Sequence, residues 1–137
     1  FLDAYRELNG CDAPNWLEGS LPAIALVSHT ALSTAFGNDE DVRGLFAQQV
    51  YGYGKKDDIL LAISTSGSSP NVVEAARVAY AKGLRVIALT GSRKTELSEK
   101  ADVAIMVPER ETYKVQELHL PVYHCLCAMV EQEIFGE

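Results

Sequence analysis

Short apolar runs alternate with amphipathic segments along most of this chain. The apolar runs span residues 22–27, 58–63, 84–89 and 103–107, and segments with helical spacing span 41–53, 71–82, 94–100 and 115–135. Because the apolar runs contain few polar residues, they are typical of strands that are buried on both faces. The repeated order of strand and helix predicts an α/β fold, a three-layer sandwich in which helices flank a parallel sheet.

The turn after the second run carries a dense cluster of hydroxyl groups. Five hydroxyl residues surround one glycine in the stretch Ser64, Thr65, Ser66, Gly67, Ser68 and Ser69. Pro70 suits the first position of a helix and Ser69 suits its N-cap. Hydroxyls beside the free N–H groups of a helix N-terminus favour binding of a phosphate. No lysine accompanies them, so the stretch is not a Walker A loop.

An ordinary turn is the alternative interpretation of this stretch. Serine, threonine and glycine cluster in turns that bind nothing, and Ser-Pro often begins a helix. A helix cap needs only one hydroxyl, whereas this stretch offers five. We therefore favour the phosphate site over the plain turn.

Three other loops are expected to meet the hydroxyl-rich turn. In an open parallel sheet, ligands bind beyond the carboxyl ends of the strands. The loops that follow the other apolar runs are residues 28–30, 90–93 and 109–114. Together with residues 64–69 they predict a single binding edge.

Composition limits the classes of function. The chain has 137 residues, which suits one domain, and its net charge of -7 disfavours binding to nucleic acid or to an anionic membrane. Its apolar runs are far shorter than the ~20 residues of a membrane span, and its beginning does not resemble a signal peptide. Cys11, Cys125 and Cys127 form no metal-binding pair and are expected to be reduced thiols. We expect a soluble, cytoplasmic protein.

The two histidines of the last segment, His119 and His124, lie on different sides of the predicted helix. Val115, Leu118, Val122, Leu126 and Met129 form one apolar stripe. His119 lies beside this stripe, which favours a structural role, whereas His124 lies opposite. On helical geometry alone His124 is expected to be a solvated surface residue.

Several motifs together resemble the sugar isomerase (SIS) domain family. The stretch Leu60-Leu61-Ala62-Ile63-Ser64-Thr65-Ser66-Gly67-Ser68-Ser69 and the later Leu84-Arg85-Val86-Ile87-Ala88-Leu89-Thr90-Gly91 carry this resemblance. Gly37-Asn38-Asp39 and Val115-Gln116-Glu117-Leu118-His119, with His124, narrow it to the phosphoheptose isomerase branch. The resemblance covers roughly residue 22 to the C-terminus and implies a flavodoxin-like or Rossmann-like arrangement.

The resemblance implies an aldose-ketose isomerase that converts sedoheptulose 7-phosphate to D-glycero-D-manno-heptose 7-phosphate. It also implies a homotetramer whose active sites lie between subunits. Carried over by position, the phosphate-binding hydroxyls are Ser64, Thr65, Ser66 and Ser69. Gln116 is implied to bind substrate and metal, and His124 to bind metal and to exchange protons with the sugar. The implied metal is zinc.

Geometry constrains that zinc site. Gln116 and His124 lie about 12 Å apart along a straight helix and about 80° apart around it. They could share one ion only at full stretch. Pro121 lies between them and is expected to bend the helix, and ligands from different subunits would remove the constraint.

This sequence also departs from the family pattern. The family carries a Gly-Asn-Gly-Gly-Ser loop and a helix bearing a histidine and the glutamate base, and neither is present here. We therefore expect residues 1–21 to be an N-terminal remnant and connecting loop, and residues 22–137 to form the sheet core and C-terminal helix of a single SIS domain. Asp3 and Glu7 do not fit the pattern of the base, so none is assigned.

The departures leave a second function open. A non-catalytic SIS module would be a phosphosugar sensor or an adaptor that binds another protein. The presence of His124 argues against this alternative.

Overall fold

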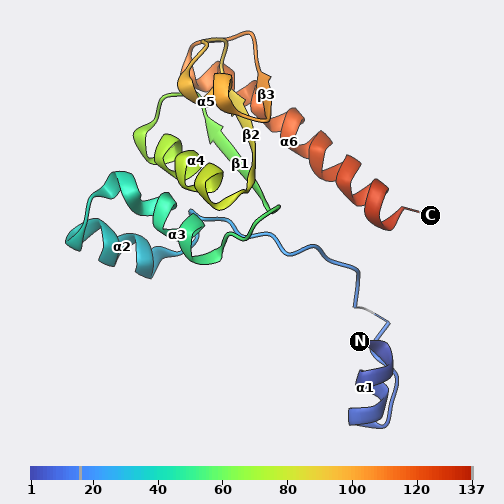
Figure 1. Cartoon of the computed structure of the whole chain (residues 1–137). Helices are drawn as coiled ribbons and strands as arrows, with labels where there is room; N and C mark the ends of the chain where they lie inside the picture. The colour runs from blue at the N-terminus through green and yellow to red at the C-terminus, as the bar shows by residue number, and fades with distance from the viewer. Residues whose placement is uncertain (16, 137) are drawn as a thin grey trace.

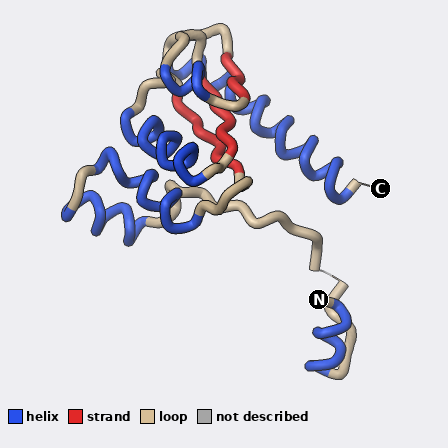
Figure 2. The backbone as a smooth tube through the Cα atoms, viewed as in Figure 1, coloured by secondary structure: helices blue, strands red, loops and turns tan. Residues whose placement is uncertain are grey.

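The computed structural model describes residues 1–15 and 17–136 and has a three-stranded parallel sheet at its centre. The strands are β1 (Ile59–Ser64), β2 (Arg85–Thr90) and β3 (Val103–Met106), in the order β1-β2-β3. Helices α4 (Pro70–Lys82) and α5 (Glu96–Lys100) connect them. The predicted α/β fold is thus confirmed, with strands between residues 59 and 106 and helices before, between and after them (Figure 2).

The remaining elements are helical. They are α1 (Leu2–Asn9), α2 (Thr30–Asp39), the 3-10 helix η1 (Val42–Gly44), α3 (Leu45–Tyr53) and α6 (Thr112–Phe135). Helix α1 stands apart from the sheet, α3 lies beside α4, and α2 lies beside α3 (Figure 1). None of the described helices is both long and apolar enough to cross a bilayer.

Helices occupy both faces of the sheet. Helix α4 lies on one face with α5, and α6 begins on the other face, near the carboxyl end of the sheet, and runs away from it (Figure 1). The main core lies under α4, where Ala75, Ala76 and Ala79 are buried against Val86 and Ala88 of the sheet. The small side chains let α4 pack closely on the strands. Residues 65–69 alone join the end of β1 to the start of α4, so the connection is a short turn.

The opposite face of the sheet is covered only in part. Ile59, Leu61 and Ile63 point away from α4 and are 64%, 41% and 46% exposed. In α6, the buried residues are Val115 and His119, both near its beginning. The first turns of α6 therefore cover the carboxyl end of the sheet, and the later turns extend beyond it (Figure 1).

The strand predicted at residues 22–27 is wrong. These residues form no ladder, and only Leu26 among them is even partly buried. The Leu26 carbonyl instead accepts a hydrogen bond of 2.9 Å from Nε2 of Gln49, which is itself 1% exposed. A strand requires a paired neighbour, and the apolar run lies against α3 without one.

The helix boundaries follow local sequence signals more closely. Helix α4 begins at Pro70 after Ser69 and ends before Gly83, which has the left-handed φ of 77° expected past a helix C-terminus. Helix α6 continues through Pro121. Helix α2 was not predicted, and α5 begins two residues later than position 94, where Thr95 provides its N-cap.

Candidate functional site

The serine loop, residues 64–69, closes on itself through its own hydroxyls. Ser64 ends β1 and is buried, and the Gly67 N–H donates to both its carbonyl and its Oγ at 3.1 Å. The Ser64 hydroxyl donates in turn to Oγ of Ser69, also at 3.1 Å. Gly67 has a φ of 68°, a backbone conformation that residues other than glycine rarely adopt. The loop is therefore a preformed turn with two hydroxyls in contact.

The start of α4 leaves donors free for an anion. The Ser69 carbonyl accepts from the N–H groups of Val72 and Val73, both at 3.0 Å, but its side chain makes no capping bond to the helix. Among the described residues, no protein acceptor pairs with the backbone N–H groups of Ser66, Ser69 and Asn71. Unpaired N–H groups at a helix N-terminus attract anions, and phosphate binding at this site stays a prediction.

Three of the four predicted loops meet at the carboxyl edge. The Gly91 N–H donates to the Thr65 carbonyl at 3.2 Å, and the Ser92 N–H donates to the Glu109 carbonyl at 2.9 Å. These bonds join the loops after β1, β2 and β3. Backbone bonds of this kind fix the serine loop against its neighbours.

The loop at residues 28–30 does not join them. His29 Nε2 lies 3.0 Å from the Tyr53 hydroxyl, at the end of α3 and near the amino end of β1. The convergence predicted for this loop is therefore wrong. The preceding apolar run does not enter the sheet, so the loop after it does not reach the carboxyl edge.

A cavity separates the serine loop from α6. Its volume is about 500 Å³, and it is lined by Ile63, Ser64, Thr65, Ser69, Gln116, His119 and Tyr123. The last three residues are spaced at i, i+3 and i+7, so they lie on one face of α6. The turn after β1 forms one wall of the cavity, and α6 forms the other.

The structure brings together most of the predicted site residues. Ser64, Thr65, Ser69 and Gln116 all line the cavity. Ser66 is exposed, and its Oγ accepts from the Ser68 N–H at 3.2 Å.

The predicted catalytic residue lies elsewhere. His124 is exposed and is not among the residues that line the cavity. Its ring contacts the ring of Tyr123 edge-on, with centroids 5.0 Å apart. The roles of all these residues stay predictions.

Sequence reasoning missed two residues of the cavity, His119 and Tyr123. His119 was placed beside the apolar stripe with a structural role favoured, and it is buried, at 3% exposed. Its Nε2, however, has no hydrogen-bond partner among the described residues. The spacing of Gln116, His119 and Tyr123 was the available signal, because residues three and four apart share one helix face.

The described residues do not by themselves build a zinc site. Among them, no three histidine, cysteine or acidic side chains gather where an ion could bind. Gln116 lines the cavity, whereas His124 does not. Catalytic zinc normally has three protein ligands. Zinc at Gln116 and His124 stays a prediction, which would need ligands from outside the described residues.

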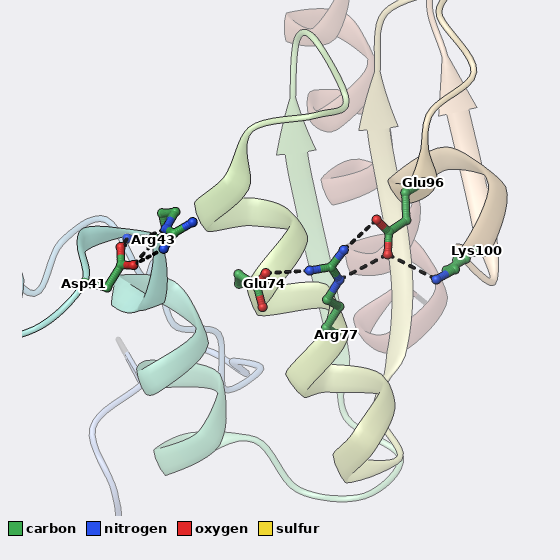
Figure 3. A network of polar contacts seen from close by, with 6 residues as sticks. All are labelled: Asp41, Arg43, Glu74, Arg77, Glu96 and Lys100. Carbon is green, nitrogen blue, oxygen red and sulfur yellow. Dashed lines mark hydrogen bonds and ion pairs between the residues drawn. The ribbon is translucent and has the colours of Figure 1, made fainter.

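An ion-pair network supports the serine loop from its outer side. Arg77 of α4 bonds to Glu74 at 2.6 Å and to Glu96 of α5 at 2.7 Å, and Lys100 bonds to Glu96 at 3.1 Å (Figure 3). Hydrogen bonds from Arg77, and secondarily from Lys100, lower the pKa of Glu96 to about 2. Glu96 follows Thr95, whose side chain lies against Gly67. The network therefore joins α4 to the start of α5 beside the loop.

These charges are separate from the cavity. Arg77 is already engaged by two carboxylates, and the residues that line the cavity include no lysine or arginine. A second exposed pair, Asp41 with Arg43, lies at the start of η1 (Figure 3). Attraction for an anion in the cavity therefore comes from N–H groups, hydroxyls and the single histidine.

Comparison with known proteins identifies the family. The model of the SIS domain matches residues 17–91, which include β1, the serine loop, α4 and β2. The chain belongs to the SIS domain family. The predicted resemblance to this family is thereby confirmed, and the serine loop is a feature of its SIS domain.

Individual relatives extend the likeness to α6. The chain is 45% identical over 117 residues to a phosphoheptose isomerase from Burkholderia pseudomallei, a match that covers 85% of this chain and 59% of the relative. It is 41% identical over 118 residues to one from Sulfurimonas denitrificans, covering 86% and 60%. The chain thus spans about three-fifths of the length of these relatives.

Solved structures agree in fold. A phosphoheptose isomerase from Francisella tularensis superimposes with a TM-score of 0.80 at 40% identity, covering 84% of this chain and 62% of that chain. One from Neisseria gonorrhoeae gives a TM-score of 0.80 at 37% identity, covering 82% and 63%. The SIS domain therefore shares its α/β fold with proteins of this activity.

Proposed function

We propose that this SIS domain is the phosphosugar-binding part of an aldose-ketose isomerase. The reaction is conversion of sedoheptulose 7-phosphate to D-glycero-D-manno-heptose 7-phosphate. The observation that carries the proposal is the cavity between the serine loop and α6, in a chain 45% identical to a phosphoheptose isomerase. The same cavity supports a role in binding carbohydrate phosphates.

The serine loop is proposed to hold the phosphate. Free N–H groups at the start of α4 and the hydroxyls of Thr65 and Ser69 can donate to phosphate oxygens. The Ser64 hydroxyl donates to Oγ of Ser69 and so orients that hydroxyl. Ser66 would contribute its backbone N–H. The phosphate is remote from the reacting carbons, so its binding energy can be used to orient them.

The α6 wall is proposed to face the sugar. Isomerisation removes a proton from the carbon beside the carbonyl and returns one to the neighbouring carbon. Gln116 offers an amide donor and acceptor for the sugar oxygens, and Tyr123 offers a hydroxyl. The proposed proton exchange by His124 requires a site that extends beyond the cavity, since His124 does not line it.

Assembly and location belong to the same proposal. By likeness to the family, we propose a cytoplasmic homotetramer in which zinc assists the reaction. Support for an oligomer comes from the apolar residues Leu120, Met129 and Ile134, which are 47%, 62% and 54% exposed along α6. Helices of this kind pack against one another between subunits.

The direct test is turnover by the whole protein. Incubation with sedoheptulose 7-phosphate should yield the manno-heptose 7-phosphate, which phosphorus NMR would detect as a new resonance. Fructose 6-phosphate serves as the comparison substrate and should give less product. Tight binding of sedoheptulose 7-phosphate without any product would contradict the isomerase and favour the phosphosugar sensor.

Ser69→Ala should weaken binding of the sugar phosphate by about 1–3 kcal/mol, the range for a lost hydrogen bond to a charged group. The substitution removes a hydroxyl that lines the cavity and accepts from Ser64. Isothermal titration with sedoheptulose 7-phosphate measures the change.

Ser68→Ala is the matched control for this prediction. Ser68 lies in the same loop but is exposed and does not line the cavity, so its loss should leave affinity within twofold. Equal losses at both positions would mean that the phosphate is held elsewhere.

A further inference from the structure

We propose that His119 is a further phosphosugar-binding residue, which contacts the phosphate held by the serine loop. The inference rests on the proposed function of the cavity. The proposal gives a ligand contact to His119, which the sequence pattern placed beside the apolar stripe of the last helix.

The first observation is the burial of an unpaired nitrogen. His119 is 3% exposed, and its Nε2 is enclosed without a hydrogen-bond partner among the described residues. Buried polar atoms in folded proteins are nearly always paired, because an unpaired one loses its bond to water and gains nothing. Because Nε2 is closed to solvent, a rotation of the imidazole would be needed to turn it into the cavity, where a ligand oxygen would pair with it.

The second observation is the position of the ring. His119 lines the same cavity as Ser64, Thr65 and Ser69, on the wall opposite the serine loop. An anion in that loop would therefore lie between the free N–H groups of α4 and the imidazole. The side chain belongs to the better-packed first turns of α6, so little ordering is required when the ligand binds.

The third observation concerns charge. A phosphate monoester carries close to two negative charges near neutral pH, and the serine loop offers only neutral donors. Among the residues that line the cavity, His119 is the only basic side chain. Its N–H is the one donor there that can also carry a positive charge, which strengthens a hydrogen bond to an anion.

The test compares two substitutions at this position. His119→Leu introduces an apolar side chain of similar size and removes the imidazole N–H donor. Affinity for sedoheptulose 7-phosphate should therefore fall at least tenfold in a calorimetric titration. His119→Gln restores an amide N–H near the position of Nε2 and should recover affinity to within about threefold of the parent.

A stability measurement separates binding from folding. Without ligand, His119→Leu should be at least as stable to urea as the parent, because it removes an unpaired buried polar atom. A histidine with a purely structural role would instead lower stability and leave affinity unchanged. His29→Leu is the matched control and should bind as the parent does, because His29 contacts the Tyr53 hydroxyl and does not line the cavity.

The outcomes distinguish this inference from the proposed function. A parent protein that binds sugar phosphate, together with a His119→Leu variant that binds equally tightly, would overturn the role of His119 alone. A parent that binds no sugar phosphate would overturn both. Inorganic phosphate, titrated into the same variants, should show the same order of affinities, because the contact is to the phosphate group rather than to the sugar.

Discussion

Gly91→Ala is expected to lower the free energy of unfolding by about 2–3 kcal/mol, the upper part of the range for overpacking a core. A Cβ at this position would lie 2.8 Å from the Thr65 carbonyl oxygen and 2.8 Å from that of Glu109. Both contacts are with backbone, which cannot rotate away as a side chain can. The substitution should therefore force apart the loops that follow all three strands.

Urea unfolding monitored by circular dichroism measures this effect. Gly52→Ala is the control, because Gly52 lies in α3 with nothing within 4 Å of the added Cβ. Removing a glycine from a helix should raise stability by about 0.5–1 kcal/mol. If Gly91→Ala also proved neutral or stabilising, the three loops would not be packed as described.

The part of the fold that could be predicted from sequence rests on local chemistry. Pro70 suits the first turn of a helix, and Gly83 accepts the left-handed conformation that ends one. These two residues fix α4 without reference to the rest of the chain. The same reasoning placed the serine loop at the end of β1, because an apolar run followed by such a helix leaves room only for a short turn.

Whether residues 22–27 form a strand depends on tertiary pairing, which the sequence pattern does not reveal. Residues 22–27 have the composition of a buried strand, yet they lie beside α3, where Gln49 supplies the hydrogen bond to Leu26. Composition describes which residues favour a strand, whereas a ladder also needs a free neighbouring edge. The misplaced loop at residues 28–30 follows from this one error.

The two histidines show the same limit in the site. A helical wheel reports direction around an axis, and it placed His119 toward the apolar side and His124 away from it. The structure agrees with both directions. The wheel cannot indicate that the buried side of α6 faces the serine loop across a cavity, since that depends on how α6 packs on the sheet. Burial therefore suggested a structural histidine where the structure has a cavity wall.

Gly67→Val is expected to weaken binding of sedoheptulose 7-phosphate at least 100-fold, or by about 2.8 kcal/mol. Gly67 has a φ of 68°, and a Cβ there would lie 2.6 Å from Oγ1 of Thr95. A β-branched residue at positive φ is strained in any case, by about 1–2 kcal/mol or more. Relief of both conflicts requires the serine loop to move, which separates its N–H groups from the hydroxyls of Ser64 and Ser69.

Gly83→Val is the control that isolates the shape of the loop from strain. Gly83 lies at the other end of α4 with a φ of 77°, and a Cβ there would meet the flexible side chain of Lys56 at 3.2 Å. Both variants should lose stability in urea through the same backbone strain, but only Gly67→Val should lose affinity. If the two variants kept equal affinity while remaining folded, the conformation of the serine loop would not determine how tightly the phosphate is held. A milder Gly67→Ala variant provides the same comparison if Gly67→Val unfolds, because its added Cβ makes the same contact with Thr95.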